Sequence, residues 1–402
     1  MRILLVTQYF HPENFKSSEL AFELAKRGHH VDALVGIPNY PEGKYYNGYG
    51  VFKKRREVLN GVNVYRAFQT PRGKGGAIGL SLNFLSFAFF ATLRVLFHFA
   101  WKKKYDAIVV YEPSPITQMI PAIILGGIRG VKVYSWVTDI WPDSVVSTIG
   151  EKKGKYIKGI LNSITNWVYR HSDKILISSK GMESLVNRDA DYSDKIIYYP
   201  HWCEDMMNMP REKVGDIPTG FNIMLAGSVN DGIGIPALIS LAKELEDAKK
   251  VNILIVGGGS GESFLKEEIA KNKLTNIYMF GRHPFSKMPA FYDKADAMLL
   301  TLKESKLPHL RATVPSRLQS YMSAGKPILA MIDGSASDLI QEANCGFAVH
   351  SGEAKALACY IKDVILKNKD EFAKCGNRSR EYYLHNFTKD LCVSNLEKIM
   401  FD

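Results

Sequence analysis

Residues 2–36, RILLVTQYFHPENFKSSELAFELAKRGHHVDALVG, hold a complete strand–helix–strand pattern. The apolar run at its start indicates a buried strand, the stretch SSELAFELAKRGH indicates an amphipathic helix, and VDALVG indicates a second strand. Parallel strands need a crossover connection of this kind, which is usually a helix. The stretch therefore predicts the first unit of an α/β domain.

The same alternation continues along the chain in two series. It predicts two doubly wound α/β domains, and the length of 402 residues agrees because single cores rarely grow beyond roughly 250–300 residues. The first series adds GVNVYRAF, DAIVVYE, VKVYSWV and KILISS, and the second comprises FNIMLAGSV, VNILIVGGG, NIYMFG, AMLLTL and PILAMI.

The break between the two series falls at 198–220, which lacks periodicity and holds three prolines. We therefore expect an N-terminal domain over residues 1–200, a linker over 201–220 and a C-terminal domain over 221–386. The remaining residues, about 387–402, are expected to form a last helix.

Positive charge is concentrated in the first half of the chain. The net charge is +11, from 52 Lys and Arg against 41 Asp and Glu, and residues 1–200 hold 27 against 16. Basic runs occur at 53–56 (KKRR), 102–104 (KKK) and 151–158 (EKKGKYIK). Such runs suit an anionic membrane surface or a nucleic acid, although solvated surface lysines give the same pattern.

The cysteines and the N-terminus indicate a cytoplasmic protein. The five cysteines are scattered singly with no CxxC pair, so we expect them to be reduced and expect no zinc site. The apolar run after Arg2 is too short for a signal peptide.

Residues 75–93, GGAIGLSLNFLSFAFFATL, are uncharged and long enough to span a membrane. Spanning is rejected because the next strand, DAIVVYE, would then lie across the membrane from its sheet partner. Two interpretations stay open, a core helix and an interfacial helix. The interfacial helix would present Phe84, Phe87, Phe90, Phe97 and Trp101 to a membrane beside KKK.

Two motifs suggest chemistry that their surroundings do not favour. VGGGSGE (256–262) opens a helix after a strand, but the next strand ends in FGRHP with no acidic residue for a ribose, so NAD binding is not expected. DAD (189–191) lies in a polar connection rather than at a rigid strand end, so no metal site is expected there.

Basic residues cluster after two strands of the C-terminal half. Arg282 follows NIYMFG, and Lys303, Lys306, Arg311 and Arg317 surround the next strand end and the helix start in TVPSRLQSYMSAGKP (313–327). In open α/β sheets ligands bind at the carboxyl ends of strands, and free N–H groups at a helix start bind anions. The pattern predicts a metal-free diphosphate site, unless each side chain simply points to water.

In the N-terminal half, aromatic and proline-rich loops follow the strands. Tyr40, Tyr45, Tyr46 and Tyr49 in GIPNYPEGKYYNGY suit sugar stacking or simple packing. Asp139, in SWVTDIWPDS, is the best-placed carboxylate for a crevice, and a helix N-cap is its alternative role.

These residues resemble the GT-B glycosyltransferases of family 4, and among them bacterial O-antigen and capsule transferases for N-acetyl-L-fucosamine. The resemblance covers nearly the whole chain. Its motifs occur in the family's order: QYFHPENF, PNYPEGKYYNGY, YEPSPIT, WVTDIWPDS, LAGSV, FGRHPFSKMP, TLKES, TVPSRLQSYMSAGKPILA and EANCGFAV.

The resemblance implies two Rossmann-like domains that face each other across an active-site cleft, with the last helix returning to the N-terminal domain. It implies retaining transfer without a metal or other cofactor, from a UDP-sugar held by the C-terminal domain. The acceptor would be a polyprenyl-diphosphate-linked saccharide, bound by a basic N-terminal domain peripheral to the inner face of the cytoplasmic membrane.

The site residues follow from matching these motifs. Catalytic roles are expected for Asp139, Arg282, Lys303 and Arg317, with Asp139 orienting a sugar or accepting a proton. Donor binding is expected of Gly227, Ser228, Gly281, Arg282, His283, Pro284, Lys303, Glu304, Arg311, Thr313, Pro315, Ser316, Arg317 and Ser320. Acceptor binding is expected of Glu13, Asn14, Tyr40, Lys44, Glu112 and Trp141.

The chain departs from the family's pattern at three places. Ala312 and Ser320 stand where family 4 commonly has two glutamates, the second of which contacts the ribose. Ser320 or Gln319 would make that contact in this chain. VNDGIG follows AGS in place of the usual basic residue, and ENFKSS stands where many relatives have a glycine pair.

Two other functions remain compatible with this fold. A sugar-nucleotide 2-epimerase would isomerise a UDP-sugar without an acceptor, and a catalytically silent scaffold would bind UDP and transfer nothing. Nucleic-acid binding is least favoured, because the basic runs lie beside an apolar helix and match no nucleic-acid motif.

Overall fold

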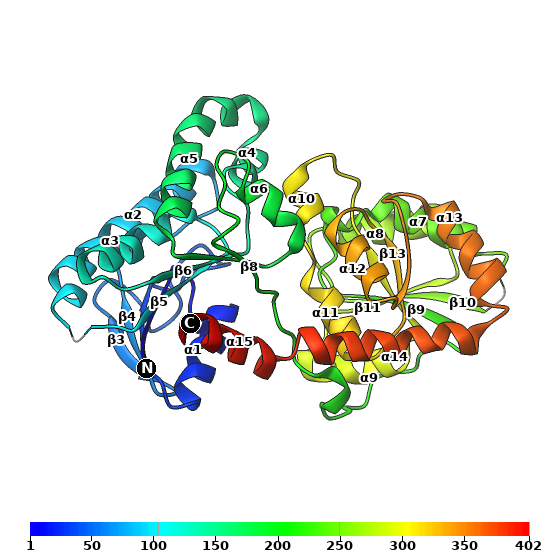
Figure 1. Cartoon of the computed structure of the whole chain (residues 1–402). Coiled ribbons are helices and arrows are strands. Elements are labelled where there is room, and N and C mark those ends of the chain that lie inside the picture. The colour runs from blue at the N-terminus through cyan, green and yellow to red at the C-terminus, as the bar shows by residue number, and fades with distance from the viewer. Residues whose placement is uncertain (103, 249, 402) are drawn as a thin grey trace. The chain divides into compact units, whose positions relative to one another are not determined.

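A computed structural model describes residues 1–402 except Lys103, Lys249 and Asp402, and it leaves out the side chains at 148, 151–153 and 155. Parts of the basic runs at 102–104 and 151–158 therefore lie outside the described residues. The chain forms two compact units, one of Met1–Tyr199 with Val393–Asp402 and one of Pro200–Cys392. Each unit has the expected doubly wound α/β architecture (Figure 1).

The N-terminal unit is built on an eight-stranded sheet. All neighbouring strands pair in parallel except the antiparallel pair β3 and β4. The order is β3 (Arg56–Leu59), β4 (Val62–Arg66), β2 (His30–Val35), β1 (Arg2–Thr7), β5 (Ala107–Glu112), β6 (Val133–Val137), β7 (Lys174–Ile177) and β8 (Ile196–Tyr198).

Helices cover both faces of this sheet, with α2, α3 and α5 on one face and α1 on the other (Figure 1). The covered strands are mostly apolar, and β1, β5 and β6 are almost entirely buried. The helices are α1 (Lys16–Lys26), α2 (Ala77–Phe97), α3 (Met119–Arg129), α4 (Asp143–Ile149), α5 (Glu151–His171) and α6 (Glu183–Val186).

The C-terminal unit is built on a six-stranded, fully parallel sheet. Its order reverses beside β9, and such a switch point is where α/β sheets bind ligands. The order is β11 (Ile277–Gly281), β10 (Val251–Val256), β9 (Phe221–Ala226), β12 (Ala297–Thr301), β13 (Ile328–Met331) and β14 (Gly346–Val349).

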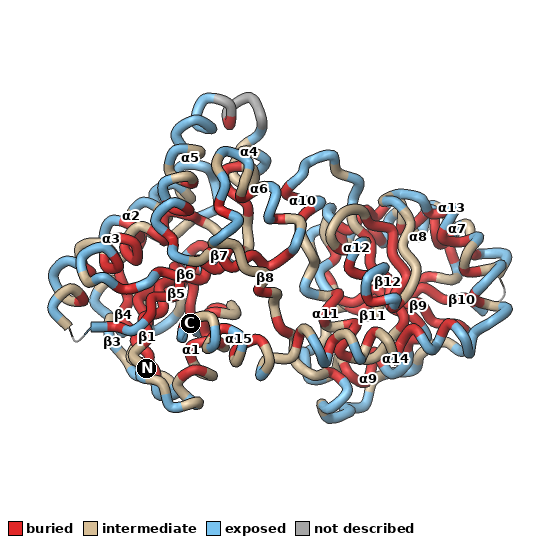
Figure 2. Tube along the Cα trace, in the orientation of Figure 1, coloured by how far each residue is buried: buried red, intermediate tan, exposed pale blue. Residues whose placement is uncertain are grey.

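Alternate residues of β9 pack into two cores, one on each face of that sheet. Ile223 and Leu225 meet α7, α8 and α13, whereas Met224 and Ala226 meet α9, α11 and α12. Figure 2 shows these strands as buried. The helices are α7 (Ile235–Glu244), α8 (Glu262–Lys271), α9 (Met288–Asp293), α10 (Pro308–Ala312), α11 (Ser316–Ser323), α12 (Ser335–Glu342), α13 (Ala354–Tyr360) and α14 (Lys369–Asn386).

The expected linker over 201–220 packs as part of the C-terminal unit. Asp205 makes a two-pronged ion pair with Arg380 of α14, with both N···O distances 2.7 Å. Arg211 donates to Asp293 of α9 at 2.8 Å. These charge-assisted contacts hold the segment against α9 and α14, so it is a packed part of the C-terminal unit.

The last helix, α15 (Lys389–Phe401), begins two residues later than expected. Its residues from Val393 onward are part of the N-terminal unit. Arg27, which follows α1, donates to Ser394 at 2.8 Å and pairs with Glu397 at 2.7 Å. The return of the chain to the N-terminal unit thus rests on specific polar contacts.

Helix α2 is mostly apolar, with Arg94 as its single charged residue. Among the described residues, one helical segment, Ala77–Trp101, is long and apolar enough by length and composition to cross a membrane, and 28% of its 18-residue apolar window is buried. Phe87 is fully buried, so its expected place on an interfacial face is wrong. Other large side chains of this segment stay exposed, among them the expected Phe90, Phe97 and Trp101, and also Ile78, Leu82, Leu85, Phe89 and Leu96.

Candidate functional site

In the C-terminal unit, the loops after β9 and β10 pack backbone to backbone. Gly227, at φ 126°, adopts a conformation that favours glycine, and a Cβ on Gly257 would lie 1.8 Å from the Gly227 carbonyl oxygen. The amide of Gly227 in turn donates to Val256 at 2.9 Å. The glycines of VGGGSGE therefore permit this close approach, which explains the motif without a dinucleotide.

Arg317, in the first turn of α11, reaches the loop after β9. Its Nη2 donates to the Ser228 carbonyl oxygen at 3.2 Å, and its guanidinium lies beside Gly227. Its Nη1 is buried and has no hydrogen-bond partner within the described part of the chain. A buried cationic donor without a partner is costly, so an anionic ligand at this strand end would stabilise it.

Two further cations lie at neighbouring strand ends, each beside a carboxylate. The Arg282 side chain passes over Gly258, where a Cβ would lie 3.0 Å from Arg282 Cγ and 2.7 Å from a Glu262 oxygen. Lys303 pairs with Asp231 at 2.8 Å, and both side chains are exposed. Their positive charge is partly neutralised and screened by water, which leaves Arg317 the less compensated cation.

Helix α11 is held against the sheet by a buried tyrosine. The Tyr321 hydroxyl accepts from the Ala226 amide and donates to the Ala226 carbonyl, both at 2.9 Å. The preceding residue, Ser320, lies 3.1 Å from the Tyr292 hydroxyl, and burial raises the pKa of that tyrosine. Gln319, the alternative to Ser320, is buried. Ser320 is therefore the more accessible of the two for a ribose hydroxyl.

The other expected donor residues lie near this strand end, and their side chains are exposed or make only local hydrogen bonds. His283 contacts the Phe280 carbonyl at 3.1 Å, and the Thr313 hydroxyl donates to the His309 carbonyl at 2.9 Å. Arg311 and Glu304 are exposed and make no side-chain hydrogen bond among the described residues. Gly281 ends β11, Pro284 follows it, Pro315 caps α11 and Ser316 begins it.

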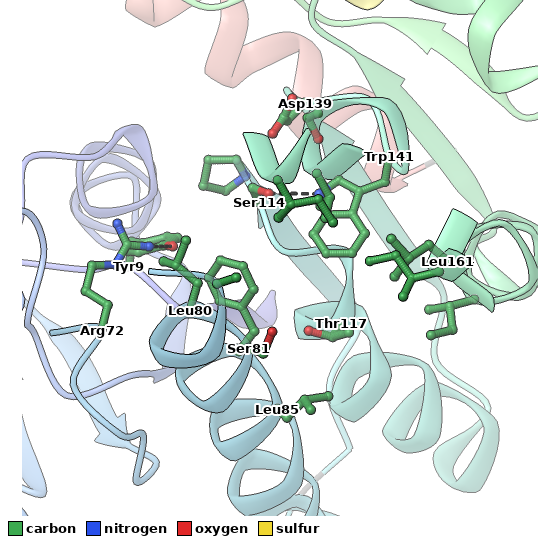
Figure 3. A pocket seen from close by; sticks show the side chains of 18 of the residues that line it. Tyr9, Arg72, Leu80, Ser81, Leu85, Ser114, Thr117, Asp139, Trp141 and Leu161 are labelled. Atoms are coloured by element: carbon green, nitrogen blue, oxygen red, sulfur yellow. Dashed lines mark hydrogen bonds between the residues drawn. The ribbon is translucent and has the colours of Figure 1, made fainter. Parts of the chain in front are cut away.

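In the N-terminal unit, a cavity of about 490 Å³ opens at the carboxyl end of the sheet. Its volume lies in the range of small-molecule sites, roughly 300–1,000 Å³. Figure 3 shows lining side chains from the loops, among them Ser114 and Asp139, and apolar side chains such as Leu80, Leu85 and Leu161 on the helices. Those walls are Leu80, Phe84 and Leu85 of α2, Val145 and Ile149 of α4, and Ile157, Leu161 and Ile164 of α5.

Asp139 lines this cavity and is half-buried. Burial raises its pKa to about 6, opposed by hydrogen bonds from Ser144, Ser114 and the Ile140 amide. A carboxyl that titrates near neutral pH in a cavity is suited to accept a proton or to orient a hydroxyl.

Two of the expected acceptor residues, Tyr40 and Trp141, line the same cavity. The Trp141 indole donates to the Ser114 hydroxyl at 2.8 Å. Asn14 and Lys44 are exposed and are not among the lining residues.

The two expected acceptor glutamates are buried beneath the surface. Glu13 is 3% exposed, and its carboxylate accepts from the Asn39 and Tyr40 amides at 2.7 Å, which organises the loop. Glu112 is fully buried within β5 and accepts from Ser135 at 3.0 Å. Neither carboxylate lines the cavity, so a direct contact with an acceptor is not supported by this structure.

The cavity also holds residues that the sequence did not single out, chiefly Arg72 and Tyr9. Arg72 Nη2 donates to the Tyr9 hydroxyl at 2.8 Å, and the Arg72 guanidinium lies over the rings of Tyr9 and Tyr40, 5.6 and 4.8 Å from their centroids. Arg72 follows Pro71 in TPRGKGG, outside every motif quoted above. A lone arginine before glycines carries no signal until the fold brings it to β1.

A metal site was not expected, and the structure does not test that prediction. Among the described residues no group of three or more His, Cys, Asp or Glu side chains is placed to hold an ion. Asp191, in DAD, accepts from the Ser193 amide at 3.0 Å.

Comparison with known proteins identifies the class of enzyme. Residues 213–382, most of the C-terminal unit, match the family model of glycosyl transferases group 1. The probable glycosyltransferase WbjE of Pseudomonas aeruginosa is 24% identical over 309 residues, which cover 74% of this chain and 75% of WbjE. The putative colanic acid biosynthesis glycosyltransferase WcaL of Escherichia coli K12 is 23% identical over 198 residues, 49% of this chain and 48% of WcaL.

Solved structures show the same fold over the whole chain. Anabaena HepE in complex with UDP has a TM-score of 0.69 at 14% sequence identity, covering 100% of this chain and 99% of HepE. The expected GT-B fold, with two Rossmann-like domains, is confirmed. The expected enzyme class is confirmed as well: the chain is a glycosyltransferase, and its C-terminal unit carries the group 1 match.

Proposed function

We propose that this glycosyltransferase moves a sugar from a UDP-sugar to a lipid-linked saccharide during the synthesis of a surface polysaccharide. The observation that carries the donor half is Arg317, a half-buried cation with an unpaired Nη1 at the end of β9. HepE, which shares the fold, was solved with UDP. WcaL, a putative colanic acid biosynthesis glycosyltransferase, supports the polysaccharide role, and WbjE, a probable glycosyltransferase, supports sugar transfer.

In the proposed reaction the bond between the anomeric carbon and the UDP oxygen breaks, and its electron pair leaves with UDP. Arg317, with Arg282 and Lys303, stabilises the charge that develops on the diphosphate. The acceptor hydroxyl oxygen then bonds to the anomeric carbon from the same face, which retains the configuration. The hydroxyl proton passes to the leaving phosphate or to Asp139. This scheme needs no metal, since the cations of the protein supply the positive charge.

The sugar and its acceptor are proposed from the resemblance stated above. The donor would carry N-acetyl-L-fucosamine or a related N-acetylamino sugar, and the acceptor would be a polyprenyl-diphosphate-linked saccharide. The cavity beside Asp139 supports an acceptor site in the N-terminal unit, because it combines polar groups with apolar walls.

A peripheral position on the inner face of the cytoplasmic membrane completes the proposal. Phe97, the last residue of α2, and Trp101, in the helical turn that follows, are 79% and 83% exposed. Positive charges gather beside them: burial and the charges of Lys102, Arg94 and Arg56 lower the pKa of His98. Aromatic side chains next to clustered cations suit the interface of an anionic membrane.

Lys102, in the basic run at 102–104, has a structural role. Lys102 pairs with the buried Asp32 at 3.0 Å and donates to the Tyr65 hydroxyl at 2.6 Å. Substitution of Lys102 would therefore disturb the core, and it is a poor probe of membrane binding.

The donor half is tested with Arg317→Ala and a matched control, Lys294→Ala, which removes an exposed cation from the same unit. UDP release from a panel of UDP-sugars is measured with and without a lipid-linked acceptor. We expect Arg317→Ala to lower kcat/KM by about 10²-fold, as for loss of one transition-state donor, and the control to be unchanged. Equal activity of Arg317→Ala and wild type would remove Arg317 from the site.

The same panel separates the alternatives. Isomerisation of a UDP-sugar without an acceptor would identify an epimerase, and UDP binding without turnover would identify a scaffold. Activity after treatment with EDTA is expected to persist, and a strict requirement for Mg²⁺ would contradict the metal-free scheme.

A further inference from the structure

The cavity of the N-terminal unit has the features of a site for a phosphorylated hydrocarbon chain. Apart from Ser81 and Ser144, its walls on α2, α4 and α5 are aliphatic or aromatic, so they favour a hydrocarbon over a sugar. At one end of these walls stands the cation Arg72, beside Tyr9 (Figure 3).

Arg72 is held in place yet keeps donors for a ligand. Its backbone amide donates to Asn39 Oδ1 at 3.1 Å, and its guanidinium lies against the rings of Tyr9 and Tyr40. Its Nε is buried and has no hydrogen-bond partner within the described part of the chain. The Tyr9 hydroxyl accepts from Arg72, which leaves its own hydrogen free to donate.

No described carboxylate makes an ion pair with Arg72. Glu13 is the acidic group that acts on Tyr9, and its oxygens are occupied by the amides of Phe10, Asn39 and Tyr40. Burial raises the pKa of Glu13 to about 7, so its negative charge is partial at neutral pH. The Arg72 end of the cavity is therefore positive and can receive an anion.

The apolar end of the cavity is continuous with the molecular surface. Leu85 and Ile157 line the cavity and are also 59% and 37% exposed. Their neighbours Leu82, Phe89 and Ile160 are exposed as well, so an apolar surface surrounds this opening. A hydrocarbon chain could pass from a membrane into the cavity without leaving apolar surroundings.

We propose that this cavity binds the lipid-proximal part of the acceptor, with the first isoprenoid units between α2 and α5 and the phosphate on Arg72 and Tyr9. This proposal rests on the lipid-linked acceptor proposed above and deepens it by assigning residues to the lipid. Arg72 and Tyr9 then position the acceptor, and the saccharide beyond the phosphate is left to the loops that carry Asp139.

The test uses farnesyl diphosphate as the probe with the full-length protein and no donor. Binding is measured by calorimetry and by quenching of Trp141, which lines the cavity. We expect farnesol and inorganic diphosphate each to bind at least tenfold more weakly, because each lacks half of the ligand. Short-chain phosphatidylglycerol distinguishes a membrane lipid from the acceptor, and binding as tight as that of the probe would overturn the assignment.

Two pairs of variants locate the ligand. Arg72→Ala should weaken binding of the probe by tenfold or more, as for loss of a charge-assisted hydrogen bond, whereas the control Lys74→Ala removes a nearby exposed cation and should not. Leu161→Asn should weaken it similarly, whereas Ile128→Asn, at an exposed position of α3 outside the cavity, should not. Arg72→Lys should restore part of the affinity.

Binding of UDP serves as the check on folding and on the proposed function. UDP affinity should be unchanged in all of these variants. If the variants transfer sugar to a lipid-linked acceptor with wild-type KM and bind the probe normally, the lipid site is wrong while the proposed function stands. If the wild type binds the probe but transfers no sugar, the proposed function is wrong and the lipid site stands.

Discussion

The buried carboxyl of Glu112 leads to a prediction about the pH dependence of stability, and the structure gives its magnitude. Its carboxyl lies fully inside the sheet of the N-terminal unit, with one hydrogen bond from Ser135 and with Oε1 unpaired among the described residues. Burial, together with the negative charge of Asp139, raises its pKa from 4.5 to about 8. Glu112 is therefore mostly protonated in the folded protein at pH 7.

This raised pKa makes the folded state less stable as the pH rises. Between pH 4.5 and 8 the folded protein keeps a proton that the unfolded chain releases, so the free energy of unfolding falls across this window. Each pH unit corresponds to about 1.4 kcal/mol, so the loss by pH 7 is about 3 kcal/mol. Glu112→Gln keeps the shape and the contact with Ser135 but has no proton to lose. We expect the variant to gain about 3 kcal/mol over wild type between pH 4.5 and 7.

The assay is urea unfolding at pH 4.5, 5.5 and 7, followed by tryptophan fluorescence. Four of the five tryptophans lie in the N-terminal unit, so the signal reports mainly on that unit. Glu183→Gln, at an exposed position of the same unit, is the control. A stability difference between Glu112→Gln and wild type that stays constant with pH would refute the buried, protonated carboxyl. Retained transferase activity in Glu112→Gln would in addition exclude the acceptor contact expected from the sequence.

Three further predictions concern the two halves of the site and the membrane. Asp139→Asn should lower kcat/KM by about 10²-fold or more. In the wild type kcat/KM should decline below about pH 6, the pKa of Asp139, and the variant should lose this decline. A wild-type kcat/KM that stays constant down to pH 5 would argue against a role for the ionised carboxylate. Gly227→Ala should weaken UDP binding, measured by calorimetry, because φ 126° strains any other residue beside Arg317; normal affinity would show that this loop adapts. The double variant Phe97→Asp with Trp101→Asp should be released from anionic vesicles in a pelleting assay, whereas the control Phe264→Asp, on the other unit, should still pellet. Pelleting of the double variant to the same extent as wild type would count against a membrane contact at α2.

The central strands were predictable, whereas the edge strands β3, β8 and β14 were not. Central strands such as β1 and β5 are covered on both faces, so they appear in the sequence as continuous apolar runs. The edge strands β3, β8 and β14 are partly exposed and carry mixed residues. One signal was overlooked: Asn60 and Gly61, both at positive φ, form the hairpin turn between β3 and β4.

The residues proposed to bind the donor were easier to bring together from the sequence than the cavity proposed for the acceptor. Gly227, Ser228 and Arg317 belong to two short motifs at strand ends, and the sheet order brings those ends together. The N-terminal cavity combines loops after β1 and β5 with α2, α4 and α5, so its residues are distant in sequence. Glu13 and Glu112 show the limit of reasoning from loop position, because burial removed both from the surface.

The sequence by itself determined the fold class, the two-domain division and the cationic strand ends of the C-terminal half. These features depend on local periodicity and on the general rule that parallel sheets gather their loops at the carboxyl ends. Only the tertiary structure decided which polar groups are buried, which cation lacks a partner, and which face of α2 lines a cavity. Those properties depend on neighbours that are distant along the chain, and no local pattern contains them. Arg72 is an example: it becomes a candidate only when β1 and α2 place it between two tyrosines and beside an apolar wall.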